Sequence, residues 1–478
     1  MEYISTRNNK KTFTFEQVFL KGLAPDGGLF IPKSFKKLTH DELKSFRNLS
    51  YQDLAKKIIF PFLGDFMSKN ELSEIIKKSY SVFRKENVVH LAKDEKNSLE
   101  IKILELFHGP TLAFKDIAMQ LLGNFYEYYL NKKNKKINII VATSGDSGAA
   151  AIDAIKGKKN INIFVLHPHD KISTVQRKIM TTTKEQNVFN LAIKGHFDDC
   201  QNLVKSMFSD QDFSNLINMS GVNSINWARI IAQSVYYFYA YFQNEFVKDN
   251  LYKEPINFSV PTGNFGDVYA GYLAKKMGLP INKLIVATND NDILHRAISK
   301  GSYEVKKVFH TLSPSMDIQV ASNFERLIYD INNFSDTETA KAMHEIKKNG
   351  KYKMSKHKIE KIKEDFLSAS LSVEEMKKII IKLSAVSDSD SVIVDPHTAI
   401  GVGAIIKASN ENKDSGVSPV NTISLATAHP AKFPEAIKFA QEGVELPTEL
   451  KHVMTEKENF KIMDNNIDLV KNFILKKI

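Results

Sequence analysis

The sequence predicts an α/β protein with mostly parallel sheets, arranged as two α/β domains that follow an N-terminal segment. Short runs of β-branched apolar residues alternate with stretches of helical periodicity, which is typical of sheets covered by helices. The chain has 478 residues, which is too long for a single compact core. Two of the expected strands also run directly into glycine-containing turns that precede helices. Such turns expose backbone N–H groups at the start of a helix.

The expected boundaries follow shifts in pattern along the chain. Residues 1–95 are predicted to be turn-rich and helical, residues 96–245 to form a first α/β domain, and residues 246–478 to form a second. Within the last part, residues 332–378 are charged and rich in lysine. This composition predicts peripheral helices and loops there, outside the core.

Each expected strand is a short apolar run that contains β-branched residues. The runs are Ile101–Phe107, Ile137–Thr143, Ile161–His167, Val188–Ile193, Ile256–Pro261, Lys283–Ala287, Val392–Val394 and Thr422–Ala426. The expected helices repeat apolar residues at the spacing of one helical face. They are Tyr51–Leu63, Glu71–Phe83, Pro110–Gly123, Ser147–Lys156, Ser173–Thr182, Asn223–Phe242, Asp267–Lys276, Ile293–Ser299 and Thr398–Ala408.

The charge balance argues against a nucleic-acid partner. The formal net charge is +11, from 66 Lys and Arg against 55 Asp and Glu. Most of the basic residues are lysines scattered among polar and acidic residues. Proteins that read bases depend on arginine and on recognisable motifs, which this sequence lacks. The excess of positive charge would still attract an anionic substrate.

The sequence also lacks features of membrane proteins, disulfide-bonded proteins and metalloproteins. No apolar run approaches the roughly 18 residues that a membrane span requires, and no apolar leader follows Met1, so no membrane partner is expected. Cys200 is the only cysteine, which excludes an intrachain disulfide and a zinc site built on cysteines. The histidines lack metal-ligand spacing, so no metal site is predicted. These features together predict a cytoplasmic enzyme.

A lysine falls on an otherwise apolar face of the expected helix Pro110–Gly123. Lys115 has Leu112, Met119 and Leu122 as its neighbours on this face. An unpartnered ammonium buried there costs roughly several kcal/mol, so the group lowers its pKa or forms a covalent bond. A neutral amine in an apolar pocket is the chemistry of a Schiff base. The alternative is that Lys115 extends to the surface, as most lysines do.

The first glycine-containing turn runs from Val141 to Ala151. A strand stops there, glycines allow a tight turn, and an alanine-rich helix begins. Free N–H groups and the positive end of the helix would face an anion, and Ser144 and Ser147 add hydroxyl donors. The alternative is an ordinary strand–helix turn in which a serine or aspartate caps the helix.

The second turn, from Ser259 to Asp267, repeats the order of strand, glycine turn and helix. It matches neither a Walker A loop nor a dinucleotide fingerprint, so ATP and NAD have no motif support. The amides of Gly263 to Gly266 fit a compact phosphate cradle. Two turns suited to anions and a lysine on an apolar face predict a phosphorylated cofactor, an anionic substrate and an imine.

Six segments along the chain form a recognisable set. They are 22–29 (Gly-Leu-Ala-Pro-Asp-Gly-Gly-Leu), 110–116 (Pro-Thr-Leu-Ala-Phe-Lys-Asp), 143–148 (Thr-Ser-Gly-Asp-Ser-Gly), 223–226 (Asn-Ser-Ile-Asn), 263–267 (Gly-Asn-Phe-Gly-Asp) and 427–433 (Thr-Ala-His-Pro-Ala-Lys-Phe). In this order they resemble segments of threonine synthases, which are fold-type II pyridoxal-phosphate (PLP) enzymes, and 110–116 is similar to the lysine segment of that family. The resemblance covers nearly the whole chain. One departure is Ser147, where many relatives carry threonine, and it keeps the hydroxyl.

The resemblance implies roles for particular residues. Lys115 would carry PLP as a Schiff base and act as the catalytic base, and Thr427 would hydrogen-bond the pyridine nitrogen. The implied ligands of the cofactor phosphate are Gly263, Asn264, Phe265 and Gly266. The implied substrate-binding residues are Ser144, Asp146, Ser147, Arg177 and Asn226.

Some residues in the same segments leave alternatives open. Arg177 and Arg229 are the better candidates for a phosphate-binding arginine, although each can equally form a salt bridge. Lys432 is expected to be a solvated lysine. The run from Asp395 to Thr398 is expected to cap a helix.

The resemblance also implies an activity. The chain would convert O-phospho-L-homoserine and water into L-threonine and phosphate, as a monomer or a homodimer. Two alternative functions are compatible with most of these motifs. One is a phospho-lyase that releases 2-oxobutyrate from the same substrate, and the other is a PLP-binding protein without catalytic activity.

Overall fold

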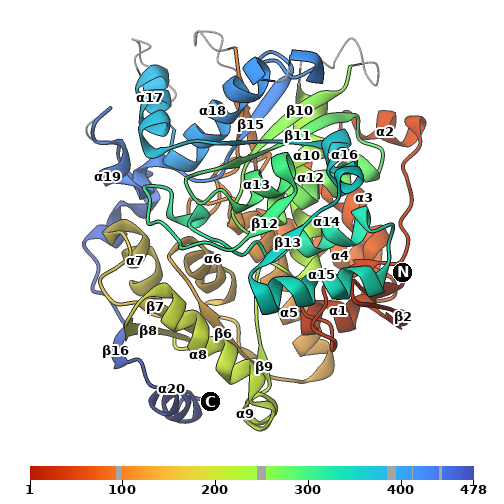
Figure 1. Ribbon diagram of the computed structural model, residues 1–478. Coiled ribbons are helices and arrows are strands. Elements are labelled where there is room, and N and C mark those ends of the chain that lie inside the picture. Colours follow the sequence, from red (N-terminus) through yellow and green to blue (C-terminus); the bar gives the residue numbers. More distant parts are fainter. Residues whose placement is uncertain (93–99, 245–253, 385–393, 412, 441–443) are drawn as a thin grey trace.

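Two mostly parallel sheets form the framework of the chain (Figure 1). The computed structural model describes residues 1–92, 100–244, 254–384, 394–411, 413–440 and 444–478. The six-stranded sheet has the order β14 (Phe366–Ser370), β11 (Ile281–Thr288), β10 (Ile256–Pro261), β15 (Thr422–Ala426), β5 (Lys102–Glu105) and β4 (His90–Ala92). Its strands are parallel except β4, which runs antiparallel to β5. The five-stranded sheet is parallel throughout, in the order β16 (Lys461–Asp464), β8 (Val188–Lys194), β7 (Ile161–Pro168), β6 (Ile137–Ala142) and β9 (Met219–Ser220).

Two smaller antiparallel sheets complete the strands. The first lies at the N-terminus in the order β2 (Asn8–Phe13), β1 (Tyr3–Ser5) and β3 (Phe30–Pro32). The second pairs β12 (Ser302–Glu304) with β13 (Lys351–Lys353). Neither sheet is predicted by the sequence, because strands this short give little periodicity.

Each large sheet draws strands from distant parts of the chain. The strand β5 lies in the predicted first domain but pairs with β15, and β16 from the C-terminal end pairs with β8. Strand pairing therefore crosses the boundaries predicted near residues 95 and 245, and these boundaries stay a prediction. Because parallel strands end at the same edge of a sheet, the turns after β10 and β15 lie close together.

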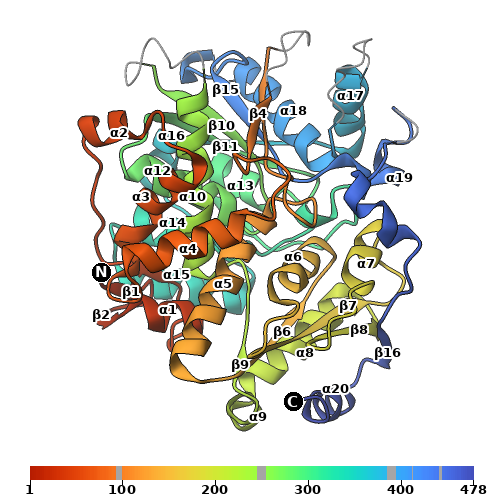
Figure 2. The same ribbon diagram turned by 180° about the vertical axis from the view of Figure 1, so that it is seen from behind.

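Helices cover both sheets (Figures 1 and 2). In the first half of the chain they are α1 (Phe15–Lys21), α2 (His40–Phe46), α3 (Tyr51–Leu63), α4 (Lys69–Tyr80), α5 (Lys115–Lys133), α6 (Asp146–Ile155), α7 (Thr174–Thr181), α8 (Phe197–Ser209), α9 (Gln211–Leu216) and α10 (Trp227–Gln243). In the second half they are α12 (Gly266–Lys276), α13 (Ile293–Lys300), α14 (Phe324–Ile331), α15 (Asp336–Asn349), α16 (Lys356–Asp365), α17 (Val373–Ser384), α18 (Pro396–Glu411), α19 (Pro434–Ile437) and α20 (Ile467–Leu475). None of the helices in the described part of the chain is long and apolar enough to cross a membrane.

The helix α10 is the central element of the largest core. Every side chain from Trp227 to Phe242 is buried, and α10 packs against α3, α5 and α12. A helix that is apolar around most of its circumference is stable only when other elements surround it. Figure 2 shows α3, α4 and α5 on the same side of the molecule, where α4 contacts both of its neighbours.

The start of α5 corrects one prediction. The helix begins at Lys115 and not at Pro110, because the backbone at Leu112 is in the left-handed region (φ +62°) and cannot continue a helix. The preceding turn is held by Asp116, whose carboxylate accepts hydrogen bonds from the N–H and the hydroxyl of Thr111 at 2.8 and 2.6 Å. Lys115 is therefore the first residue of a helix, directly after a strained turn.

Residues 332–378 are also less peripheral than predicted. They contain α15 and α16, as expected, but β14 is an edge strand of the six-stranded sheet that pairs with β11. The short run Phe366–Ser370 contains two serines, and the lysines around it hide its pattern. The other predicted strands are confirmed to within about two residues, and the other predicted helices to within about four. The predicted strand 392–394 lies largely outside the described residues.

Candidate active site

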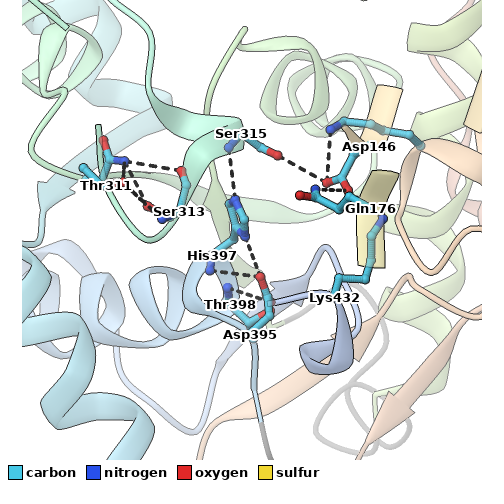
Figure 3. A network of polar contacts seen from close by, with 11 residues as sticks. Asp146, Gln176, Thr311, Ser313, Ser315, Asp395, His397, Thr398 and Lys432 are labelled. Carbon is cyan, nitrogen blue, oxygen red and sulfur yellow. Dashed lines mark hydrogen bonds and ion pairs between the residues drawn. The ribbon is translucent and has the colours of Figure 1, made fainter. Parts of the chain in front are cut away.

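Three segments that are far apart in the sequence bring two lysines and an aspartate together. Lys115 is the first residue of α5, Asp146 is the first residue of α6, and Lys432 ends the short 3-10 helix η3 (Pro430–Lys432). Lys115 Nζ lies 3.5 Å from Asp146 Oδ2, and Lys432 Nζ lies 2.6 Å from Asp146 Oδ1. Figure 3 shows Lys432, Gln176 and Ser315 around the carboxylate of Asp146.

Each carboxylate oxygen of Asp146 has two polar partners. Besides Lys432, Oδ1 accepts a hydrogen bond from the side-chain amide of Gln176 at 2.9 Å. Besides Lys115, Oδ2 accepts one from the hydroxyl of Ser315 at 3.2 Å. Burial by itself raises the pKa of Asp146, but the two lysine cations outweigh burial and hold this pKa well below its usual range. Asp146 is therefore a carboxylate anion at neutral pH.

Lys115 is largely buried, as the sequence predicted, with its side chain 13% exposed, but its surroundings include the carboxylate of Asp146 and are not wholly apolar. Burial is the main cause that lowers the pKa of Lys115. The anion of Asp146 acts in the opposite direction, whereas the cations of Lys432 and Arg229 lower this pKa further. The structure thus favours a nucleophilic amine at Lys115 over the alternative in which the side chain extends into solvent.

The turn before α6 carries Ser144 and Ser147 beside Asp146. The hydroxyl of Thr143 organises this turn by accepting hydrogen bonds from the N–H groups of Gly145 and Gly148, at 3.0 and 2.8 Å. Both serines are partly exposed, and no hydrogen bond of either hydroxyl is found within the described part of the chain. These hydroxyls are therefore available to a ligand at the start of α6.

The turn before α12 has the features of a phosphate cradle. A side chain at Gly263 would place its Cβ 2.6 Å from the carbonyl oxygen of Ser315, so only glycine fits there. Phe265 adopts a left-handed conformation (φ +62°), and its ring is buried against Phe324. Within the described ranges, no acceptor is found for the backbone amides of residues 263–266, and these amides precede the positive end of α12.

Thr427 is held beside the lysine segment by main-chain contacts. Its carbonyl oxygen accepts a hydrogen bond from the N–H of Phe114 at 2.9 Å, and Ala113 and Ala428 form an antiparallel bridge. Thr427 is 6% exposed, and no described residue hydrogen-bonds its hydroxyl. The hydroxyl is therefore available to a ligand group at this point.

The chemistry of these groups fits PLP, since each polar part of the cofactor meets a suitable protein group. Lys115 provides an amine for the aldehyde, the amides of 263–266 provide donors for the phosphate, and Thr427 provides a hydroxyl for the ring nitrogen. The glycine at 263 is what keeps the cradle open to a phosphate. The roles of these individual residues stay predictions.

Two predicted substrate-binding residues, Arg177 and Asn226, already have partners within the protein. Arg177 donates to Glu458 from Nε and Nη2, at 2.8 and 3.2 Å, which is the salt-bridge alternative stated above. The amide of Asn226 caps α10 by accepting from the N–H of Ala228, and it donates to the carbonyl oxygen of Phe19 at 2.8 Å. Both side chains already have partners within the protein, and these partners compete with a substrate. Contact of Arg177 and Asn226 with substrate therefore stays a prediction.

Arg229 differs from Arg177 because no described carboxylate pairs with it. Its Nη1 donates to the carbonyl oxygen of Val222 at 3.3 Å, and its Nε is buried without a partner. Burial lowers the pKa of Arg229 to about 10, so the guanidinium remains charged at neutral pH. A buried cation with an unused donor near Lys115 is suited to a phosphate.

The structure corrects the prediction for Lys432 and adds residues that the sequence did not indicate. Lys432 is 0% exposed and is not solvated. Ser315 lies in the short 3-10 helix η1 (Pro314–Met316), and no pattern in the sequence relates it to Asp146. Its N–H donates to His397 Nε2 at 3.3 Å, and His397 Nδ1 lies 2.5 Å from Asp395 Oδ2 (Figure 3). As predicted, Asp395 caps a helix, by accepting from the N–H groups of His397 and Thr398 at the start of α18.

Comparisons with known proteins identify the family. Models described as "Threonine synthase N terminus", "Pyridoxal-phosphate dependent enzyme" and "Threonine synthase, C-terminal" match residues 2–80, 89–352 and 398–474. The threonine synthase of Saccharomyces cerevisiae is 43% identical, over 99% of this chain and 97% of its own length. The chain belongs to the threonine synthase family. The threonine synthase of Pseudomonas aeruginosa is 42% identical, over 99% of this chain and 98% of its own length.

Solved structures of family members have the same fold. The crystal structure of the yeast threonine synthase superposes with a TM-score of 0.93 at 42% identity, and covers 100% of this chain and 98% of that one. The PLP-bound threonine synthase of Brucella melitensis gives a TM-score of 0.91 at 41% identity, over 100% and 99% of the two chains. The fold class predicted from the sequence, fold-type II of the PLP enzymes, is confirmed, and so is the cofactor.

Proposed function

We propose that this chain converts O-phospho-L-homoserine and water into L-threonine and phosphate. Membership of the threonine synthase family supports the product. The observation that carries the proposal is the largely buried amine of Lys115, 3.5 Å from Asp146 at the start of α6, in a chain that also has a phosphate cradle before α12. A PLP-binding protein without activity would not need this amine together with an intact cradle.

The chain's own residues divide the work of the reaction. PLP, when bound, withdraws electrons from the substrate's α carbon. Lys115 holds the cofactor and, once the substrate amine has replaced it, takes the proton from the α carbon. The amides of 263–266 bind the cofactor phosphate, and the hydroxyl of Thr427 hydrogen-bonds the ring nitrogen. Because a neutral hydroxyl does not force this nitrogen to be protonated, electron withdrawal is milder than with an aspartate at that place.

The substrate carries two anionic groups, and the site offers separate donors for them. Ser144 and Ser147 present hydroxyls at the start of α6, which suits a carboxylate. Arg229 has a buried guanidinium with an unused donor, which suits the phosphate. Arg177 and Asn226 are weaker candidates for substrate ligands than Ser144, Ser147 and Arg229. Arg177 already pairs with Glu458, and Asn226 already caps α10.

Product analysis tests this function. The holoenzyme is mixed with O-phospho-L-homoserine, and the carbon product is identified together with released phosphate. L-threonine with an equal amount of phosphate is expected. Release of 2-oxobutyrate with phosphate would assign the chain as a phospho-lyase, and no phosphate release would refute both enzymes.

Two further parts of the proposal have their own measurements. A monomer or a homodimer is proposed, and light scattering coupled to size-exclusion chromatography distinguishes these states from larger assemblies. A cytoplasmic site of action is proposed, and fractionation of cells that express the tagged chain tests it.

A further inference from the structure

Lys432 is a second lysine at the candidate active site, and none of the roles proposed above uses it. Its ammonium contacts two oxygens, Asp146 Oδ1 at 2.6 Å and the carbonyl oxygen of Thr111 at 2.8 Å. Its side chain is completely buried. A buried ammonium is tolerated only where it is paired and hydrogen-bonded. These contacts hold Lys432 as a cation at a fixed place.

One carboxylate lies between the two lysines at unequal distances. Asp146 is 2.6 Å from Lys432 but 3.5 Å from Lys115. Lys432 has a second acceptor in Thr111, whereas Asp146 is the only acceptor found for Lys115 among the described residues. The ion pair of Asp146 with Lys432 is therefore the stronger of the two, and Asp146 stabilises the charge on Lys115 less.

Other charged groups around the two lysines do not reverse this order. Lys115 faces Asp146, Lys432 and Arg229, and the two cations among them disfavour a charge on Lys115. Among the described residues, the groups near Lys432 include Asp116 and His429 besides Asp146 and Lys115.

We propose that Lys432 is a positioning residue that occupies one oxygen of Asp146 as a permanent cation, so that Lys115 is left as a free amine for the cofactor. Lys432 acts through Asp146 and does not touch the reacting atoms. This inference rests on the proposed role of Lys115. Without Lys432, Lys115 would be the only lysine paired with Asp146 among the described residues, and the carboxylate would stabilise its protonated form more strongly.

The test measures the protonation of Lys115 in the protein without cofactor. The apo-protein is treated briefly with acetic anhydride, which acylates only neutral amines, at a series of pH values, and peptide mapping gives the pH midpoint for Lys115. In Lys432→Met this midpoint is expected to rise by about one pH unit or more, which is about tenfold less neutral amine at a given pH. Lys432→Arg keeps the cation and is expected to restore the midpoint to within a few tenths of a unit.

Matched controls separate this effect from a general loss of charge or structure. Lys438→Met removes an exposed lysine six residues further along the same segment, and no change in the midpoint is expected. Circular dichroism reports whether each variant is folded. If Lys432→Met does not fold, Lys432→Gln keeps donors near both oxygens without the charge, and the same rise is expected. An unchanged midpoint in a folded neutral variant would overturn the proposal, as would acylation of Lys432 at lower pH than Lys115 in the unaltered protein.

A second readout separates this proposal from the proposed function. Apo-protein is titrated with PLP, reduced with borohydride, and mapped for a pyridoxyl group. A pyridoxyl group on Lys115 together with an unchanged midpoint in the variant would refute the role of Lys432 and keep the function. A shifted midpoint without a pyridoxyl group on Lys115 would keep the role of Lys432 and refute the function.

Discussion

Replacement of Gly263 by alanine is expected to damage the phosphate cradle. The new Cβ would lie 2.6 Å from the carbonyl oxygen of Ser315, about 0.8 Å closer than the 3.4 Å at which ordinary contacts begin. The loop that carries Ser315 cannot move away freely, because Asp317 accepts hydrogen bonds from Asn289 and Thr311, each at 2.7 Å. Either the loop gives up these bonds or the turn before α12 shifts.

Overpacking of this kind costs about 1–3 kcal/mol. Gly263→Ala should therefore lose about 1–3 kcal/mol of unfolding free energy in urea, and a shifted cradle should bind PLP about 5- to 150-fold more weakly. PLP affinity is measured by equilibrium titration of the apo-protein. Gly266→Ala is the matched comparison for stability, because its Cβ would lie 3.2 Å from the side-chain amide of Asn323, a less close approach than the one at Gly263, so a smaller loss is expected. Equal stability and equal PLP affinity in Gly263→Ala and the unaltered protein would refute the close approach on which the cradle depends.

The remaining predictions concern the amine, the arginine and a buried histidine. Lys115→Ala should lower the rate of phosphate release by at least about 100-fold, because the Lys115 amine both holds the cofactor and transfers the proton. The pyridoxyl adduct on the peptide that contains residue 115 should also disappear. Full activity with an adduct on another peptide would contradict this prediction. Arg229→Gln should raise KM for the phosphorylated substrate about 10- to 150-fold, because one charge-assisted hydrogen bond to the substrate is lost. An unchanged KM would exclude this contact. Burial lowers the pKa of His167 to about 4, so the unfolded chain binds one more proton below pH 6.5, and stability falls as the pH drops from 6.5 to 4. His167→Gln should reduce this slope by up to about 1.4 kcal/mol per pH unit, measured by urea unfolding across that range, and an unaltered slope would contradict a neutral buried imidazole.

The sequence predicts those structural elements that are determined by residues close together in the chain. The strands that end in the two anion-binding turns and the helices that follow them are confirmed, because strand runs, glycine turns and helix starts are encoded by neighbouring residues. The burial of Lys115 is also predicted correctly, although the helix starts five residues later than expected. Its apolar neighbours Met119 and Leu122 do lie in α5 and are buried.

The sequence could not predict features that arise from contacts between distant segments. Lys432 is indistinguishable from a surface lysine until η3 is placed against Thr111 and Asp146, more than 280 residues earlier. Ser315 hydrogen-bonds Asp146 from a single turn of 3-10 helix, which is too short to give a pattern in the sequence. Only the tertiary fold shows that Arg177 pairs with Glu458, whereas none of the carboxylates in the described ranges pairs with Arg229.

The pairing of β15 between β10 and β5 has a consequence for synthesis on the ribosome. β5 is made before residue 106 and β10 before residue 262, but the strand that joins them is complete only at Ala426. Until then both strands present unpaired backbone groups, which are a hazard for association with other chains. The nascent chain therefore carries open sheet edges for most of its translation, and the pocket around Lys115 is assembled only when the final tenth of the polypeptide leaves the exit tunnel.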